Sequence, residues 1–270
     1  MLENYTVITF EKKGPVAEVF LNRPEKSNAM NPPFWPEIRE VFLRIHQDPE
    51  IRAAVVAGKG KNFSAGLDLV ASAQSFGGTV GSAEMDSLFH AILQMQESFN
   101  AIEECKKPVI AAIHGACIGG GLDLVAACDI RLASADARFS LREARVAMIS
   151  DLGSLNRLPH IIGQGHAREL AFTGKDITAE RALRIGLVND VFPDPESCLA
   201  AARELALEIA AAAPLAVQGA KEVMNYSRDQ SLRDGLAYAA ARSCLILKAG
   251  DLMEAVTAFM QKRKPAFKGK

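Results

Sequence analysis

The sequence predicts an α/β protein that ends in a helical region. Three observations support this fold class. Short β-prone runs alternate with amphipathic helical patterns up to residue 195, strands then disappear while four helical patterns follow, and one apolar strand enters a helix through three consecutive glycines. With 270 residues the chain is long enough for a substantial core. We therefore expect an α/β core at residues 1–195 and a C-terminal helical region at residues 196–270.

Composition excludes several classes of protein. The formal net charge of −1 gives no basic surface for nucleic acid or anionic lipid. Five scattered cysteines without a C-x-x-C pair indicate reduced thiols, and no metal-ligand spacing is present. The N-terminus lacks a signal-peptide pattern, and no apolar run is long enough for a membrane span. We expect a cytoplasmic protein without nucleic-acid, membrane or metal binding.

The elements follow from periodicity and from the residues that interrupt it. Lys13-Gly14 lies between two β-prone runs and predicts a hairpin, and Asn31-Pro32 is typical of a helix start. The Ser/Gly-rich residues 71–83 are expected to be mobile. We expect strands near residues 6–10, 16–21, 51–57, 109–113, 130–133 and 139–141, a long helix over 85–102, and a helix closed by Gly186 before a short strand.

The segment from Lys107 to Asp129 organises the chain. Its β-branched run 109–113 predicts a buried strand, which breaks at Gly115 and continues through residues 119–121 into a Leu/Ala-rich helix. Three glycines let another molecule approach the backbone, and the first N–H groups of the helix are left unpaired. Such a turn can hold a phosphate, a carboxylate or a developing oxyanion.

These segments carry a resemblance that covers nearly the whole chain. The order, spacing and residue types of its motifs resemble the crotonase (enoyl-CoA hydratase/isomerase) superfamily. The motifs are LNRPEKSNAMN, NFSAGLDL, KPVIAAIHGACIGGGLDLVAACDIRLAS, FSLREARVAMISDLGSLNRLP, FTGKDITAERALRIGLVNDVF and AFMQKRKPAF. The resemblance implies the crotonase (ClpP-like) fold, a spiral of ββα units whose C-terminal helices mediate homotrimers or dimers of trimers.

The resemblance also implies an acyl-CoA thioester substrate, with coenzyme A as part of the substrate and no further cofactor. The thioester loses a proton from carbon, and the negative charge moves to its oxygen. By resemblance, the backbone N–H groups of Ala65 and Gly120 form the oxyanion hole. Losing one such donor typically costs a factor of about 10²–10³ in rate.

Three acids determine which reaction is expected. Asp123, Glu143 and Asp151 resemble the branch that isomerises 3,5-dienoyl-CoA to 2,4-dienoyl-CoA in fatty-acid β-oxidation. One acid removes a proton at C2 and another delivers one at C6, and neighbouring carboxyl groups in a dry pocket divide these roles by their pKa values. We expect Glu143 near C2, Asp151 near C6 and Asp123 in support, although sequence leaves this order open.

Further residues are assigned to the coenzyme A side of the site by the same resemblance. Lys26 and Lys61 are phosphate candidates, whereas Asp68 is expected to brace its loop. Phe259 and Lys262 match a C-terminal position that reaches coenzyme A, often from a neighbouring subunit. The complete substrate-side set is Arg23, Lys26, Asn28, Lys61, Ser64, Gly66, Asp68, Phe259 and Lys262.

Simpler alternatives remain at this point. Asp123 could be an N-terminal helix acid, Asp151 a helix cap, Glu143 a surface partner of the nearby arginines, and His114 a core histidine. At the level of function, one rival is a hydratase that adds water to 2-enoyl-CoA. Another, from a different class, is a non-catalytic relative that binds acyl-CoA or RNA.

Overall fold

A six-stranded sheet forms the centre of the computed structural model, which describes residues 5–72 and 81–270. The predicted hairpin around Lys13-Gly14 is confirmed as the antiparallel edge of this sheet, and all its other pairings are parallel. In spatial order the strands are β1 (Ile8–Lys13), β2 (Val16–Leu21), β3 (Ala53–Gly58), β4 (Val109–Ile113), β6 (Ile130–Ser134) and β9 (Asp190–Phe192).

A second, three-stranded sheet begins directly after β4. It consists of β5 (Ala116–Ile118), β7 (Arg138–Ser140) and β8 (Ile177–Thr178). The chain turns from β4 into β5 at Gly115, whose φ is +55°, and a Cβ there would lie 2.2 Å from the Lys61 carbonyl oxygen. Only glycine fits so close to that backbone, and the turn brings β5 beside the loop that follows β3.

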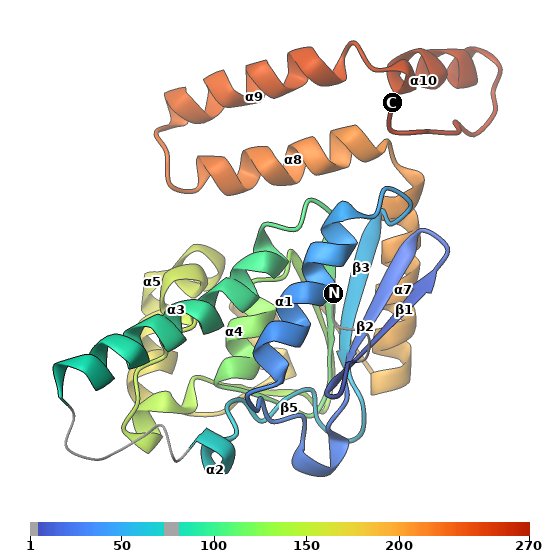
Figure 1. Cartoon of the computed structure of the whole chain (residues 1–270). Helices are drawn as coiled ribbons and strands as arrows, with labels where there is room; N and C mark the ends of the chain where they lie inside the picture. The colour runs from blue at the N-terminus through green and yellow to red at the C-terminus, as the bar shows by residue number, and fades with distance from the viewer. Residues whose placement is uncertain (1–4, 73–80) are drawn as a thin grey trace.

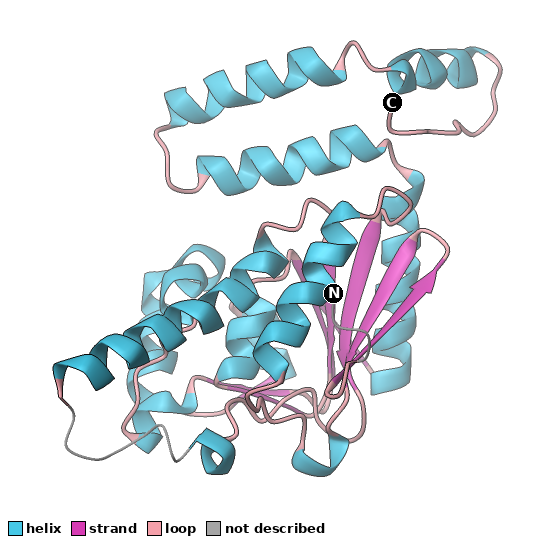
Figure 2. Cartoon of the chain, in the orientation of Figure 1, coloured by secondary structure: helices cyan, strands magenta, loops and turns pink. Residues whose placement is uncertain are grey.

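Helices cover both faces of the large sheet (Figures 1 and 2). The predicted long helix is confirmed as α3. The first helix, expected to start near Asn31-Pro32, begins at Phe34 with Pro33 as its N-cap. The α-helices are α1 (Phe34–Gln47), α2 (Leu69–Ser72), α3 (Ser82–Glu103), α4 (Gly120–Ala126), α5 (Ser154–Thr173), α6 (Ala179–Arg184), α7 (Pro195–Ala211), α8 (Pro214–Ser227), α9 (Leu232–Ile246) and α10 (Gly250–Met260), with 3₁₀ turns η1 (Pro24–Lys26) and η3 (Arg142–Val146). Of the expected mobile segment 71–83, residues 73–80 lie outside the described residues.

The sheet is apolar on both faces, which explains why its strands are continuous apolar runs. Val56 points into the core that includes α1 and α3, whereas Val55 and Ile110 point into a second core shared with α7. The sequence prediction placed residues 196–270, and so almost all of α7, in the C-terminal region. Since α7 packs on β2, β3, β4 and β6, the part of the chain outside the core begins at α8.

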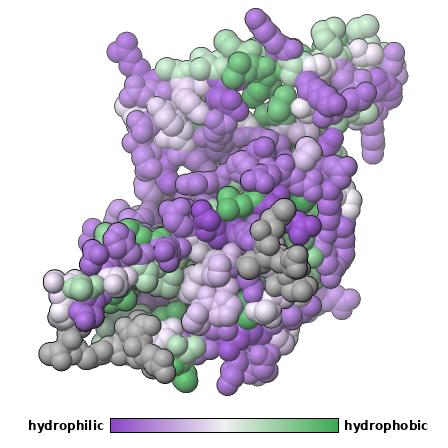
Figure 3. Space-filling view, viewed as in Figure 1, coloured by the Kyte–Doolittle hydropathy of each residue, from purple (hydrophilic) through white to green (hydrophobic). Residues whose placement is uncertain are grey.

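The C-terminal helices extend beyond this core. Figure 1 shows α8 and α9 as an antiparallel pair above the sheet, with α10 beyond them. Stacked rings of Tyr226 and Tyr238, 4.1 Å apart, join the pair, and apolar side chains gather on these helices in Figure 3. Exposed large apolar residues of this region are Met224, Leu232, Leu236, Leu245, Leu247, Leu252, Met253, Val256, Phe259 and Met260. Within the described residues, no helix has the length and apolar character required to span a bilayer.

Candidate active site

The glycine turn lies where three segments of the chain meet. Gly119, with φ +52°, caps α4, and a Cβ at this position would lie 2.8 Å from Glu143 Oε1. A Cβ at Gly121 would lie 3.0 Å from the Ser64 side chain. The glycines therefore allow both the loop after β3 and the η3 turn to approach the start of α4, so at Gly119 and Gly121 the space of a Cβ is taken by the chain itself.

The loop of residues 64–68 is held by two isolated β-bridges, Met30 to Leu67 and Ser64 to Cys117. At the first bridge, Met30 N–H donates to the Gly66 carbonyl at 2.8 Å and Asp68 N–H donates to the Met30 carbonyl at 3.0 Å. In a parallel bridge of this kind, the N–H of the central residue points away from its partner. Leu67 N–H therefore points away from Met30.

This geometry corrects one predicted site residue. Ala65 N–H donates to the Ser27 carbonyl at 2.9 Å, so the prediction that it forms part of an oxyanion hole is wrong. Leu67 N–H has no hydrogen-bond acceptor among the described residues, and a Cβ on Gly120 would lie 3.7 Å from the Leu67 nitrogen. Gly120 opens α4, where N–H groups lack intrahelical acceptors. Leu67 and Gly120 thus supply the neighbouring unpaired donors.

Asp123 lies in α4 and is almost completely buried. Its Oδ1 accepts hydrogen bonds from Ser154 N–H at 2.6 Å and from Ser150 Oγ at 3.3 Å. Burial raises the pKa of Asp123 to about 6, and the nearby charge of Asp151 acts in the same direction. Asp123 therefore joins α4 to the segment that precedes α5, which is more than a helix-start acid does.

Glu143 lies in η3 beside the glycine turn. Among the described residues its buried Oε2 has no hydrogen-bond partner. Burial raises the pKa of Glu143 to about 7, and the charges of Asp123 and Asp151 contribute to the shift. The surface ion-pair alternative is not supported, because Arg142 pairs with Asp176 and Arg145 Nε donates to the Thr173 carbonyl.

Asp151 lies half-buried in the segment before α5. It does not cap that helix, because Gly153 occupies the N-cap and no side chain bonds there. Burial raises the pKa of Asp151, and its charge raises the pKa of both Asp123 and Glu143. The structure thus brings the three predicted acids into one electrostatic environment, which is the condition for dividing acid and base roles.

Several residues assigned to the coenzyme A side hold the two site loops together. Arg23 Nη1 donates to the Ala29 carbonyl at 2.7 Å and to Asp68 Oδ2 at 3.0 Å. Asp68 accepts a further bond from Ala71 N–H, which with Arg23 holds the pKa of Asp68 below its ordinary value. The predicted bracing role of Asp68 is confirmed, and Arg23 is its partner.

Asn28 and Ser64 are buried parts of the same framework. Asn28 Nδ2 donates to the carbonyls of Lys59 and Asn62, and Ser64 Oγ donates to the Asn28 carbonyl at 2.9 Å. Lys26 and Lys61 are exposed on these loops and available to a ligand. Only glycine fits at position 66. Its φ is +86°, and a Cβ there would lie 2.5 Å from the Ile118 carbonyl oxygen.

Phe259 and Lys262 are remote from this chain's own acids. Phe259 is 86% exposed at the end of α10, and Lys262 follows it. Figure 1 places α10 at the opposite end of the molecule from β5 and α2. Within one chain these residues do not reach the glycine turn.

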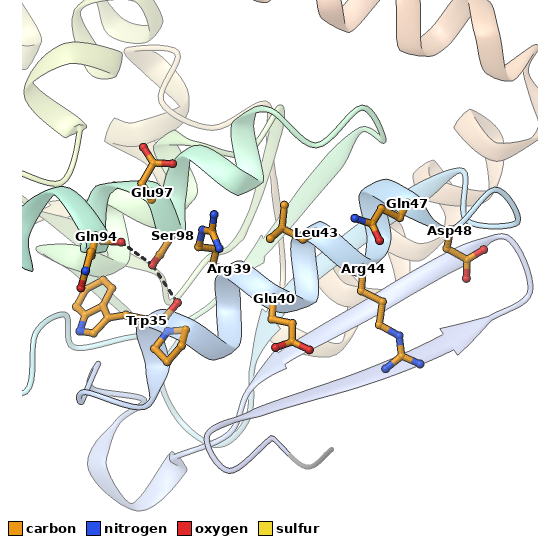
Figure 4. A pocket seen from close by; sticks show the side chains of 11 residues that line it. Trp35, Arg39, Glu40, Leu43, Arg44, Gln47, Asp48, Gln94, Glu97 and Ser98 are labelled. Atoms are coloured by element: carbon orange, nitrogen blue, oxygen red, sulfur yellow. Dashed lines mark hydrogen bonds between the residues drawn. The ribbon is translucent and has the colours of Figure 1, made fainter. Parts of the chain in front are cut away.

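Other polar features do not belong to the site. A cavity of about 910 Å³ lies between α1 and α3, and none of the three acids lines it (Figure 4). His114 Nε2 lies 3.0 Å from the Gly60 carbonyl oxygen, which confirms a hydrogen-bonded core histidine. No cluster of three or more potential metal ligands occurs among residues 5–72 and 81–270.

Comparisons with known proteins agree with this geometry. The family model "Enoyl-CoA hydratase/isomerase" matches residues 11–270. The chain is 43% identical to the mitochondrial Δ(3,5)-Δ(2,4)-dienoyl-CoA isomerase of Dictyostelium discoideum, over 99% of this chain and 93% of that protein. It is 41% identical to the peroxisomal Δ(3,5)-Δ(2,4)-dienoyl-CoA isomerase of Arabidopsis thaliana, over 98% of each.

Solved structures confirm the predicted crotonase fold. The crystal structure of enoyl-CoA hydratase from Bacillus anthracis superposes with a TM-score of 0.90 at 31% identity, over 98% of this chain and 100% of that one. The family model and the structural similarity both cover nearly the whole chain, including the glycine turn and the three acids. The chain belongs to the enoyl-CoA hydratase/isomerase family.

Proposed function

We propose that this protein isomerises 3,5-dienoyl-CoA to 2,4-dienoyl-CoA in the β-oxidation of unsaturated fatty acids. One observation carries the proposal: Glu143, whose pKa burial raises to about 7, lies beside the glycine turn near the unpaired N–H groups of Leu67 and Gly120, and the charges of Asp123 and Asp151 contribute to that raised pKa. The dienoyl-CoA isomerase names of its relatives support it.

In this proposal the Leu67 and Gly120 N–H groups receive the thioester oxygen. A base breaks the C2–H bond, and the electron pair spreads over the thioester oxygen and the conjugated carbons as far as C6. Protonation at C6 then leaves double bonds at C2 and C4, so one proton is removed and one is added. Preorganised amides stabilise this charge without reorientation during the reaction.

Glu143 is the proposed base at C2. Its pKa of about 7 is matched to neutral pH, and its unpaired buried oxygen is free to receive a proton. Asp151 is the proposed acid at C6, as its place in the family motif implies, and burial raises its pKa above the ordinary value. Asp123, fixed by Ser150 and Ser154, holds the Asp151 segment next to α4.

The remaining parts of the proposal concern the ligand and the assembly. Lys26 and Lys61 would contact coenzyme A phosphates, and Phe259 and Lys262 would reach the site of a neighbouring copy in a homotrimer or dimer of trimers. The reaction moves only protons, so we propose no metal or redox cofactor. A cytoplasmic location stays a prediction, whereas the names of the two relatives place those proteins in mitochondria and peroxisomes.

An ultraviolet assay for diene conjugation tests the proposal. Purified protein is expected to convert a 3,5-dienoyl-CoA into the conjugated 2,4-isomer, and Asp151→Asn should lower kcat by about 10²-fold or more, in the range of lost acid–base catalysis. Asp190→Asn, at an exposed position on β9, should leave the rate unchanged. Equal rates for wild type and Asp151→Asn would remove Asp151 from the mechanism.

The same preparation distinguishes the rival functions. A hydratase would convert 2-enoyl-CoA to 3-hydroxyacyl-CoA faster than it isomerises the dienoyl substrate. An RNA-binding relative would show a salt-dependent gel shift, which the net charge of −1 does not favour.

A further inference from the structure

The segment that carries Asp151 is held from two sides. On the α4 side, Asp123 accepts hydrogen bonds from Ser150 and Ser154, as described above. On the α3 side, Gln96 Nε2 donates to the Asp151 carbonyl at 2.6 Å. The position of Asp151 therefore depends on residues outside the acid cluster.

Arg157 in α5 provides the second contact on the α3 side. Its Nη1 donates to the Leu152 carbonyl at 3.3 Å. A Cβ on Gly153, whose φ is +122°, would lie only 1.9 Å from the same Nη1. The backbone directly after Asp151 thus packs on the guanidinium group and has a glycine where the two meet.

The Arg157 guanidinium group is itself fixed by α3. Nε and Nη2 donate to Glu103 Oε2 at 3.0 and 2.8 Å, and Nη2 also donates to Asn100 Oδ1 at 2.8 Å. Arg157 is buried, and its Nε and Nη2 groups share one charged oxygen of Glu103, so these charge-assisted hydrogen bonds fix the orientation of the guanidinium plane. Its side chain is therefore positioned before any substrate binds.

Glu103 extends this network to the C-terminal helices. Its other oxygen, Oε1, pairs with Arg228, the residue that follows α8. Asn225 Nδ2 in α8 donates to the Glu103 carbonyl at 3.1 Å. A continuous set of polar contacts therefore connects α8 with the Asp151 segment through Glu103 and Arg157.

We infer that Arg157 is a positioning residue that fixes Asp151 for proton delivery, and that the Glu103–Arg228 pair makes this position depend on the docking of α8. The inference rests on the proposed isomerase function. A displacement of about 1 Å in a catalytic group can cost up to roughly 10²-fold in rate. Arg228 lines the same pocket as Asp151, but its ion pairs among the described residues are with Glu103 and Asp229, so the chain of polar contacts from Arg228 to the Asp151 segment runs through Glu103 and Arg157.

Arg228→Met tests the inference, with Arg242→Met as the matched control. Arg242 pairs with Glu222 within the α8–α9 pair, and both arginine side chains are 31% exposed. We expect Arg228→Met to lower kcat for the 3,5-dienoyl-CoA by about tenfold with KM changed less than twofold, a loss confined to the transition state. Arg228→Lys should restore most of the rate, and Arg242→Met should match wild type.

Arg157→Lys is the direct variant and should lose about 10²-fold in kcat, because an ammonium group cannot reproduce the guanidinium contacts. If it fails to fold, the Arg228 series still decides. Unchanged kcat in Arg228→Met, an equal loss in Arg242→Met, or a rise in KM alone would overturn the inference. An inactive wild type would instead reject the proposed function.

Discussion

At the scale of single residues, Glu143 is held in surroundings that oppose its ionisation. One of its oxygens is buried without a partner among the described residues, and two other acids lie close enough to raise its pKa. A carboxyl group with a pKa of about 7 is a stronger base than one at the ordinary value of 4.5. Burial therefore gives a common side chain the basicity that removal of a carbon-bound proton requires.

This environment predicts an acid limb in the pH profile. Because the proposed base acts in its ionised form, kcat/KM should fall tenfold per pH unit below about pH 7, the pKa of Glu143. Glu143→Gln should lose about 10²–10⁴-fold, the usual range for a general base. A pH series of initial rates measures both effects, and a limb near pH 4.5 would show that burial does not tune this group.

The raised pKa of Asp123 predicts that stability falls as the pH rises, whereas a salt-bridged carboxylate loses stability as the pH falls. The folded pKa of Asp123, about 6, exceeds the ordinary 3.8, so its contribution to stability is complete below about pH 3.8 and is lost as the pH rises to 6. The difference corresponds to roughly 3 kcal/mol. Asp123→Asn should therefore gain stability relative to wild type between these pH values.

Urea unfolding of wild type and Asp123→Asn at pH 4 and at pH 8 measures this difference in unfolding free energy. Asparagine is the suitable replacement because its side-chain oxygen can still accept the Ser154 N–H. Asp190→Asn, which removes an exposed carboxylate on β9, is the control for the loss of one charge. A wild type that gains stability relative to Asp123→Asn as the pH rises would contradict the assignment.

Sequence identified the acids but not their neighbours. Asp123, Glu143 and Asp151 could be predicted as site residues because residue type and motif order are read directly from the sequence. The choice of Ala65 failed because a hydrogen bond to Ser27, 38 residues earlier, decides which amide is free, and no local pattern reveals that contact. Leu67 could be identified only from its bridge to Met30.

At the scale of elements, Gly66 shows how a loop and a helix start share one site. Its positive φ and its closeness to the Ile118 carbonyl place the Leu67 amide next to α4. Gly66→Ala should lower kcat by about 10²-fold or more, the typical cost of one lost oxyanion donor, because the loop has to move away. Circular dichroism checks the fold, and Gly165→Ala, in open space on α5, is the matched control.

An unchanged rate in Gly66→Ala would show that the loop tolerates this movement and that Leu67 is not a required donor. Strand boundaries at this place were also difficult to predict. β5 has only three residues and follows β4 after a two-residue turn, so the apolar run hides the change from one sheet to the other. Long elements such as α3 were predictable because their periodicity extends over many turns.

At the scale of the whole molecule, the C-terminal helices present an apolar surface that one chain does not cover. Charged contacts, including Lys221 Nζ to Asp129 Oδ2 at 2.6 Å, connect α8 to the core, while the large apolar residues of α9 and α10 remain exposed. An apolar surface of this kind is expected to become buried in an assembly.

The assembly predicts a measurable mass. Sedimentation equilibrium should give three or six times the chain mass of 29.0 kDa. Replacing Val256 and Met260, both exposed on α10, by aspartate should lower that mass, because charged side chains oppose apolar association. A wild-type monomer at micromolar concentration would contradict the predicted trimer and the reach of Phe259 into a neighbouring site.

The two isolated bridges that hold residues 64–68 have a consequence for ligand binding. Each fixes the loop at one point, through Asp68 N–H at one end and Ile118 N–H at the other, before a ligand is present. Amide hydrogen exchange at these two positions should already be slow in the free protein. Binding of a thioester would then quench little motion here, and its entropy cost would arise mainly in the ligand's own flexible chain.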